Sequence, residues 1–201
     1  ILLCLEKWTQ MVDNGSSVDV AYFDYAKAFD KVSHRLLLIK LEAYGIKGQM
    51  LKWLRDYLDN RKQRVVVGGA TSPWLQVVSG TTQGTVLGVL LFLLFINDLP
   101  KKCSPVDETL IMLLADDTKS YQEIVKDPTQ HANCQQALQL RIDQIAQWAK
   151  DWGMVIHPAK SKILHIGNAA DMNRCNVAIN TVIRRIFSVA AWQSIRPRRI
   201  T

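Results

Sequence analysis

The feature that most constrains the fold is an apolar segment that stops at two adjacent acids. Residues 110–115 read Leu-Ile-Met-Leu-Leu-Ala, and Asp116 and Asp117 follow before a mixed polar segment, 118–121. An apolar run of this length beside turn-forming residues predicts a buried strand, and the change of pattern after it predicts a β-hairpin. Aspartate also favours turns without any chemical role. The pair alone therefore leaves a purely structural interpretation open.

A second strand pattern also ends at an acid. Residues 18–23 are largely apolar, and Asp24 follows them directly. If the two strands are neighbours in one sheet, their carboxylates converge and repel one another unless a cation lies between them. Hard divalent cations take oxygen ligands, and paired metal ions serve in-line displacement at phosphorus. The residues alone suggest two-metal phosphoryl transfer by Asp24, Asp116 and Asp117.

Four motifs in order extend this interpretation. They are Phe-Asp-Tyr-Ala-Lys-Ala-Phe-Asp at 23–30, Ser-Gly-Thr-Thr-Gln-Gly-Thr-Val-Leu-Gly at 79–88, Phe-Ile-Asn-Asp-Leu at 95–99 and Ala-Asp-Asp at 115–117. Together they resemble the motifs of reverse transcriptases from non-LTR (LINE-type) retrotransposons, over residues 1–190. The resemblance implies an α/β (α+β) palm of a right-hand polymerase, an antiparallel sheet of three or four main strands backed by helices.

The resemblance also implies an activity and its cofactor. The family reaction is RNA-directed DNA synthesis, a nucleotidyl transfer from a deoxynucleoside triphosphate to a primer 3′-hydroxyl on an RNA template. In that reading Asp24, Asp116 and Asp117 are catalytic and hold two Mg²⁺ ions, for which Mn²⁺ could substitute. The substrate-binding residues implied are Tyr25, Phe29 against the sugar, Gln83, Gly84, and Lys160 against phosphate charge.

Several positions depart from the family pattern. Thr82 stands where relatives usually have Pro, Val89 replaces another Pro, and Leu114 replaces the usual aromatic residue before Ala-Asp-Asp. Loss of proline removes a restriction on the backbone of that loop. A truncated, inactive remnant that at most binds nucleic acid is therefore an alternative, although all three acids are retained. A metal-dependent nuclease is a weaker one, because such a site usually adds a His or Glu, and none is evident near the acids.

Charge and composition bear on the partners. The 201 residues carry a formal net charge of +7 with a pI near 9.3, which fits a polyanionic partner. Arg61, Lys62 and Arg64 form the basic start of a predicted hairpin, and phosphate contact there is about as well supported as a solvated loop. The four cysteines are far apart in sequence, as in a reduced intracellular protein of cytoplasm or nucleus that is not secreted. Residues 86–96 are too few to span a membrane.

The pattern of apolar residues predicts the remaining elements. We expect helices at 1–12, 35–44 with Ser33 as N-cap, 49–58, 86–97 as a core helix, and from about 129 to Gly153. A hairpin is expected at 65–67 and 74–78, and a closing strand pair at 154–157 and 163–166. We expect residues 1–190 to be a palm with partial fingers, with a short strand within 176–189 and a divergent tail at 191–201. The remaining fingers, the thumb and any endonuclease region would lie elsewhere in a parent polyprotein.

Overall fold

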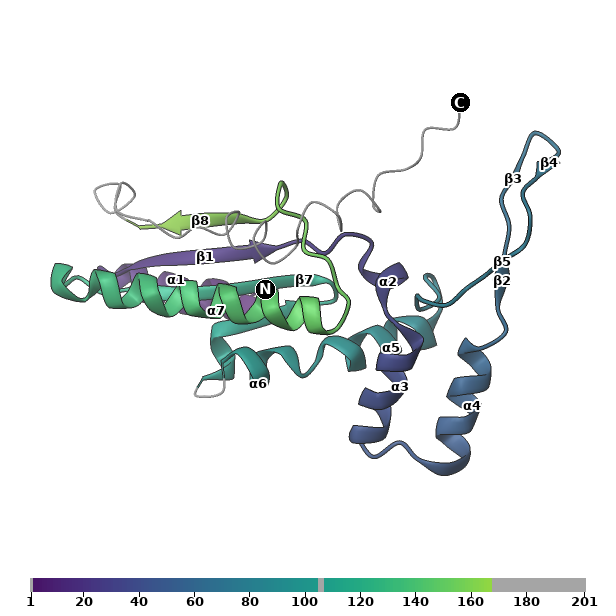
Figure 1. The fold of residues 1–201 in the computed structure, drawn as a ribbon. Helices are drawn as coiled ribbons and strands as arrows, with labels where there is room; N and C mark the ends of the chain where they lie inside the picture. The colour runs from purple at the N-terminus through teal and green to yellow at the C-terminus, as the bar shows by residue number, and fades with distance from the viewer. Residues whose placement is uncertain (1, 105–106, 168–201) are drawn as a thin grey trace. The chain divides into compact units, whose positions relative to one another are not determined.

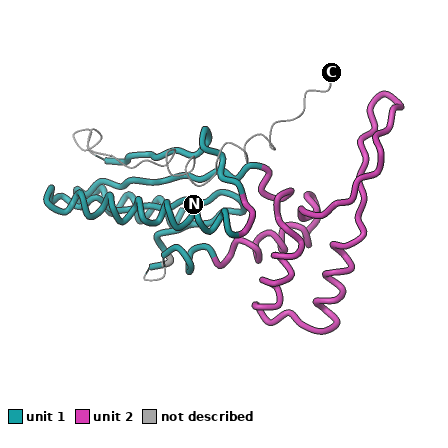
Figure 2. The backbone as a smooth tube through the Cα atoms, in the orientation of Figure 1, with its two compact units in different colours: residues 1–26, 99–151, 155–201 teal, residues 27–98, 152–154 magenta. Residues whose placement is uncertain are grey.

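The computed structural model describes residues 2–104 and 107–167. The chain divides into two compact units, shown in different colours in Figure 2. The first comprises residues 1–26, 99–151 and 155–201, and the second comprises residues 27–98 and 152–154. The short strand expected within 176–189 and the tail at 191–201 lie outside the described residues.

The first unit is built on one antiparallel sheet of four strands (Figure 1). The order is β6-β7-β1-β8, and every neighbouring pair is antiparallel. The strands are β1 (Ser17–Phe23), β6 (Ile111–Leu114), β7 (Asp117–Ile124) and β8 (Lys162–Ile166). Two of them, β1 and β7, are central, and they are the strands next to the predicted acids. The expected antiparallel sheet of three or four main strands is confirmed.

Helices α1 (Leu2–Asp13) and α7 (His131–Asp151) cover opposite faces of this sheet. Because side chains alternate along a strand, Val20 and its partner Tyr121 share one face, whereas Ala21 and its partner Ser120 share the other. Trp8 of α1 packs edge-on against Tyr121, with ring centroids 6.0 Å apart. Arg141 of α7 donates from Nε to Ser120 Oγ at 3.2 Å and from an Nη to the Tyr121 carbonyl at 2.9 Å.

Short helices complete the first unit. Two 3₁₀ turns, Glu108–Leu110 and Pro128–Gln130, precede β6 and α7, and helix α6 spans Leu99–Cys103. The predicted long helix is confirmed, and Gly153 follows it at a φ of +71°, the left-handed conformation that commonly ends a helix.

The expected strand pair at 154–157 and 163–166 is wrong. Both segments lie antiparallel to the β1 chain instead of pairing with each other: Ile156 forms a bridge with Tyr25, and Lys162 pairs with Tyr22. Tyr22 and Tyr25 are three positions apart, whereas Ile156 and Lys162 are six apart. The returning chain therefore carries three extra residues, which are accommodated as a turn. Pro158 lies in this turn, where its lack of an N–H costs no ladder hydrogen bond.

The second unit combines four helices with a hairpin (Figure 1). The helices are α2 (Ala28–Lys31), α3 (His34–Ala43), α4 (Gly48–Leu58) and α5 (Val86–Ile96). The hairpin consists of two short ladders, β2 (Lys62–Gln63) with β5 (Leu75–Gln76) and β3 (Val66–Val67) with β4 (Ala70–Thr71). Ser33 is the N-cap of α3 as predicted, because its Oγ accepts from Leu36 N–H.

Helix α5 is only half buried, which corrects the expectation of a core helix. Phe92 and Phe95 are fully buried, but Val86, Leu90 and Leu93 on the other side of the helix are exposed. Lys40 of α3 is buried beside it, donates to the Phe95 carbonyl at 2.6 Å and pairs with the Asp98 carboxylate. Asp98 thus has a structural role. Among the described residues, no helix has both the length and the apolar character needed to cross a membrane.

Candidate active site

Asp24 lies at the end of the central strand β1 and is fixed by the turn that follows Ile156. Its N–H donates to Ser161 Oγ at 3.3 Å, and its carbonyl accepts from His157 N–H at 2.7 Å. The buried residues of β1 and these backbone hydrogen bonds hold Asp24 in place, while its side chain remains 39% exposed. The carboxylate is therefore oriented by the sheet and accessible from solvent.

Asp116 and Asp117 lie at the tight turn between β6 and β7. Leu114 pairs with Asp117, so the turn contains only Ala115 and Asp116. Ala115 has a φ of +53°, a conformation that the tight hairpin turns require and that is strained for a residue with a Cβ. Both acids are exposed. The predicted hairpin with the acids at its turn is confirmed. The expected burial of its first strand is wrong, because β6 is an edge strand in which Ile111 is buried but Leu114 is exposed.

The sheet brings the end of β1 and the start of β7 together. The last paired residues of the two strands are Phe23 and Thr118, so Asp24 and Asp117 are the next residues on adjacent strands, which are about 4.8 Å apart in a sheet. The strands that end in acids, β1 and β6, are not themselves neighbours, because β7 lies between them. Instead, the turn between β6 and β7 carries Asp116 and Asp117 to the start of β7, which is the neighbour of β1.

Lys160 lies beside Asp24, with its Nζ 3.6 Å from Asp24 Oδ2. Both side chains are well exposed, so solvent screening leaves the pair little influence on stability. Lys160 lies in the turn at residues 157–161, where the three extra residues keep it from pairing with β1. A cation thus already lies against one of the three predicted metal-binding carboxylates.

Tyr25, which the resemblance placed at the substrate, has a buried side chain. It is 4% exposed, and its hydroxyl accepts from Thr118 Oγ1 at 3.4 Å. Burial raises the pKa of Tyr25 well above its ordinary value, so the phenol stays neutral. Its contact with Thr118 joins the chain just after β1 to the start of β7.

Asp24, Asp116 and Asp117 are the carboxylates predicted to bind metal. Within residues 2–104 and 107–167, no three His, Cys, Asp or Glu side chains are grouped so as to hold a metal ion. The chemistry of the donors does fit a hard divalent cation, because carboxylate oxygens are the ligands that Mg²⁺ takes. The ammonium of Lys160 beside Asp24 also shows that positive charge is accommodated there.

The second unit holds the other residues that the resemblance singled out. Phe29 of α2 stacks on Phe92 of α5, with centroids 4.4 Å apart and the rings inclined by 25°. Gln83 and Gly84 are exposed in the turn before α5, and Gly84 has a φ of +81°. This turn belongs to the segment 79–85, which we call the Gly-Thr loop.

The Gly-Thr loop is fixed at both ends by hydrogen bonds. At its start, Gly80 N–H donates to the Val32 carbonyl at 2.8 Å and Thr81 N–H donates to the Phe29 carbonyl at 2.9 Å. At its end, Thr85 caps α5: its Oγ1 accepts from Gly88 N–H at 3.0 Å and donates to the Thr82 carbonyl at 2.9 Å. The loop thus has a defined conformation although Thr82 stands where the family pattern has Pro.

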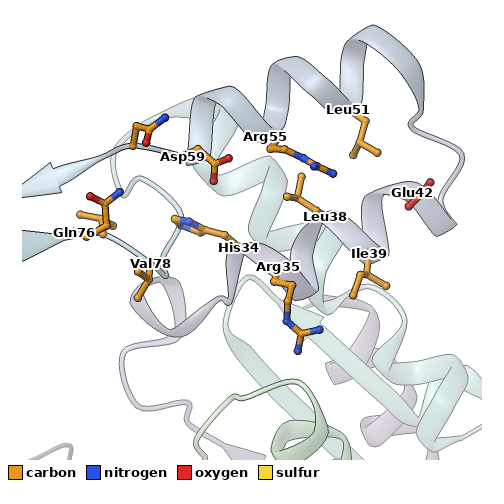
Figure 3. A pocket seen from close by; sticks show the side chains of 12 residues that line it. His34, Arg35, Leu38, Ile39, Glu42, Leu51, Arg55, Asp59, Gln76 and Val78 are labelled. Atoms are coloured by element: carbon orange, nitrogen blue, oxygen red, sulfur yellow. The ribbon is translucent and has the colours of Figure 1, made fainter.

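Two cavities flank the base of the hairpin in this unit. One, of about 490 Å³, lies between α3, α4 and β5, and its lining combines Arg35 and Arg55 with Glu42 and Asp59 (Figure 3). The other, of about 560 Å³, is bordered by the Gly-Thr loop and by Arg61 and Lys62, two of the three basic residues predicted to contact nucleic acid. Arg64, the third, is exposed on the hairpin beyond it.

Comparison with known families decides the assignment. Residues 5–193 match the family model described as reverse transcriptase (RNA-dependent DNA polymerase). The chain belongs to this reverse transcriptase family. The predicted family is confirmed, and the antiparallel sheet with its helices is the polymerase palm-type fold of reverse transcriptases.

Named reverse transcriptases from mobile elements are similar to this chain. The RNA-directed DNA polymerase from mobile element jockey of Drosophila melanogaster is 31% identical over 145 residues, which cover 70% of this chain and 15% of that protein. The retrovirus-related Pol polyprotein from type-1 retrotransposable element R2 of Popillia japonica is 32% identical over 85 residues, 42% of this chain and 14% of that protein. The probable RNA-directed DNA polymerase from transposon X-element of Drosophila melanogaster is 28% identical over 145 residues, 70% of this chain and 15% of that protein. The chain thus spans about 15% of the length of these three relatives.

Sequence reasoning missed three residues that shape these sites. Ser161, whose Oγ accepts a hydrogen bond from the Asp24 N–H, directly follows Lys160 in the sequence, and no local pattern marks it. Lys27 and Lys31 border the cavity beside the Gly-Thr loop. Their proximity to the predicted basic residues depends on the hairpin's fold, so no local pattern could have revealed it.

Proposed function

We propose that the chain is the palm of an RNA-directed DNA polymerase that adds deoxynucleotides to a DNA primer on an RNA template. The observation that carries the proposal is the β1–β7 register, which ends at Phe23 and Thr118, so that Asp24 and Asp117 are the next residues on the two strands and Asp116 lies in the adjoining turn. Because the two central strands meet the acids at the same end of the sheet, the sheet holds the backbone of these acids in position. Phosphoryl transfer requires such positioning.

In the proposed reaction, the primer 3′-oxygen attacks the α-phosphorus of a deoxynucleoside triphosphate, and pyrophosphate leaves with the electron pair of the broken P–O bond. The proton of the hydroxyl passes to solvent. Asp24, Asp116 and Asp117 would hold two Mg²⁺ ions, or Mn²⁺. Bound there, the ions would lower the pKa of the attacking hydroxyl and neutralise the charge of the departing pyrophosphate.

The chain's other residues would bind and orient the nucleotide. Lys160, which faces Asp24, would pair with phosphate charge. Phe29 would lie against the sugar, and Gln83 and Gly84, exposed in the Gly-Thr loop, would border the nucleotide. We assign Tyr25 a structural role, because its side chain is buried.

The test is primer extension by a chimera in which these residues replace the matching segment of the jockey polymerase, since the chain spans about 15% of that protein. Replacing Asp116 and Asp117 with Asn should abolish extension on an RNA template. Asp143→Asn is the matched control, because Asp143 is an exposed acid on α7 outside the site. Extension that survives the double substitution would refute the assignment of the acids. A chimera that never extends a primer would favour the inactive remnant.

A further inference from the structure

The hairpin of the second unit presents an aromatic ring with a cation on one side. The guanidinium of Arg64 lies 4.6 Å from the centroid of the Trp74 ring. Trp74 is nevertheless 58% exposed. A guanidinium at this distance attracts the ring electrostatically, only weakly at an exposed site, and favours this orientation. Much of the ring surface stays open to solvent.

The register of the hairpin places this pair on the same face as basic residues at the hairpin base. Lys62 pairs with Gln76 across β2 and β5. Arg64 is two residues beyond Lys62, and Trp74 is two residues before Gln76, so alternation puts all four side chains on one face. The β2–β5 pairing extends to the hairpin base, where Val77 N–H donates to the Arg61 carbonyl at 2.8 Å. Toward the tip, Ser72 N–H donates to the Val65 carbonyl at 2.9 Å, where the pairing is shifted by one residue and continues as the β3–β4 ladder.

This face leads into the cavity beside the Gly-Thr loop. Lys62 and Gln76 both line that cavity of about 560 Å³. Its other basic residues are Lys27, Lys31 and Arg61, against the acid Asp30. The cavity of Figure 3 instead balances two arginines with two acids. Only an excess of positive charge selects a polyanion, so the cavity beside the Gly-Thr loop is the better fit to phosphates.

We propose that this cavity and the hairpin face form a binding track for single-stranded nucleic acid. Backbone phosphates would occupy the cavity against Lys31, Arg61 and Lys62, and a base would stack on the open surface of Trp74. A basic groove combined with an aromatic stacking residue is the usual arrangement for single strands. A duplex is disfavoured at Trp74 because its bases are already stacked on one another. This proposal rests on the proposed function, because the polymerase assignment is what makes nucleic acid the expected ligand.

The test is binding of a fluorescently labelled 12-nucleotide oligouridylate to the 201-residue chain, measured by anisotropy in EDTA so that no catalysis occurs. Trp74→Ala should weaken binding about 5- to 140-fold, the usual value of one stacked base, and Trp74→Phe should restore most of it. Trp53→Ala is the matched control, because Trp53 is 53% exposed on α4, stacks on Tyr57 and does not line the cavity. It should bind like the parent chain.

The salt dependence separates phosphate contacts from stacking. Lys62→Gln should reduce the slope of log affinity against log salt by about 0.7, the single-strand value for one phosphate contact. Trp74→Ala should leave that slope unchanged. A slope that falls as much for Trp74→Ala as for Lys62→Gln would overturn the assignment of Trp74 to a base.

Other outcomes also overturn the proposal. Unchanged affinity in Trp74→Ala, an equal loss in Trp53→Ala, or tighter binding of a 12-base-pair duplex would each do so. A concentration-dependent dimer that Trp74→Ala abolishes would assign the hairpin to protein contact instead. The polymerase proposal fails separately: if the chimera does not extend a primer while oligouridylate still binds through Trp74, only the catalytic assignment is wrong.

Discussion

Replacing Gly88 with Ala tests whether the Gly-Thr loop is built by close backbone packing. Gly88 lies in the first turn of α5, and an added Cβ would be 2.0 Å from the Thr82 carbonyl oxygen and 2.8 Å from its carbon. Real Cβ atoms essentially never come within 3.0 Å of other heavy atoms. The Thr82 backbone must therefore move by about 1 Å or more, and it is also the acceptor for the capping residue Thr85.

Helix propensity and close packing predict opposite signs for this substitution. Ala is favoured over Gly in a helix by about 1 kcal/mol. Overpacking costs about 1–3 kcal/mol, and a damaged N-cap costs about 1 kcal/mol more. The expected net effect is a loss of about 1–3 kcal/mol in the free energy of unfolding. In the chimera, displacement of Gln83 and Gly84 should also slow primer extension.

The assay is urea unfolding of the parent chain, Gly88→Ala and Val89→Ala, with amide hydrogen exchange of α5 as a local measure. Val89 is an exposed neighbour on the same helix, so its substitution should change stability by less than about 0.5 kcal/mol. If Gly88→Ala is as stable as the parent chain or more stable, the close approach of Thr82 to the helix does not exist in solution, and our account of the loop is wrong.

Three further predictions concern other parts of the chain. Phe29→Val in the chimera should admit ribonucleotides more readily, because a smaller side chain would clash less with a 2′-hydroxyl; unchanged sugar discrimination in competition assays would remove Phe29 from the sugar site. The 201 residues alone should bind Mn²⁺ weakly, by calorimetry, yet extend a primer far more slowly than the chimera, because the rate depends on holding three substrates in line; fast extension that Asn at Asp116 and Asp117 abolishes would contradict this. Asp98→Asn should reduce the free energy of unfolding by about 3–5 kcal/mol, since Lys40 is only 4% exposed and would lose its charged partner; a change below about 1 kcal/mol in urea unfolding would show that Lys40 needs no carboxylate.

The sequence predicts the ends of strands best where an apolar run stops directly at a charged residue. The apolar run before Asp116 and the one before Asp24 end where strands end in the structure, because burial and turn formation act on neighbouring residues there. That these acids would meet depended on strand order, which the family resemblance supplied. In the structure, β7 lies between β6 and β1. Residue patterns alone do not specify which strand of the β6–β7 hairpin pairs with β1.

Predictions failed where packing against a distant segment decides the structure. Residues 154–157 and 163–166 have the composition of a hairpin, but both meet the β1 chain, whose buried edge offers hydrogen bonds to each. Helix α5 is apolar all round, a pattern that predicts full burial, yet Val86 is 90% exposed. No periodicity could show which side of such a helix is covered.

The turn opposite the end of β1 separates the register of β8 from the identity of the side chain presented to Asp24. Five residues, 157–161, lie between the Tyr25 bridge and the first pair of β8, opposite only two residues of the β1 chain. The turn that carries Lys160 could therefore be lengthened, shortened or exchanged without shifting the pairing of β8 on β1. Evolution or protein engineering could vary the cation presented to Asp24 by replacing this turn while the sheet keeps its register.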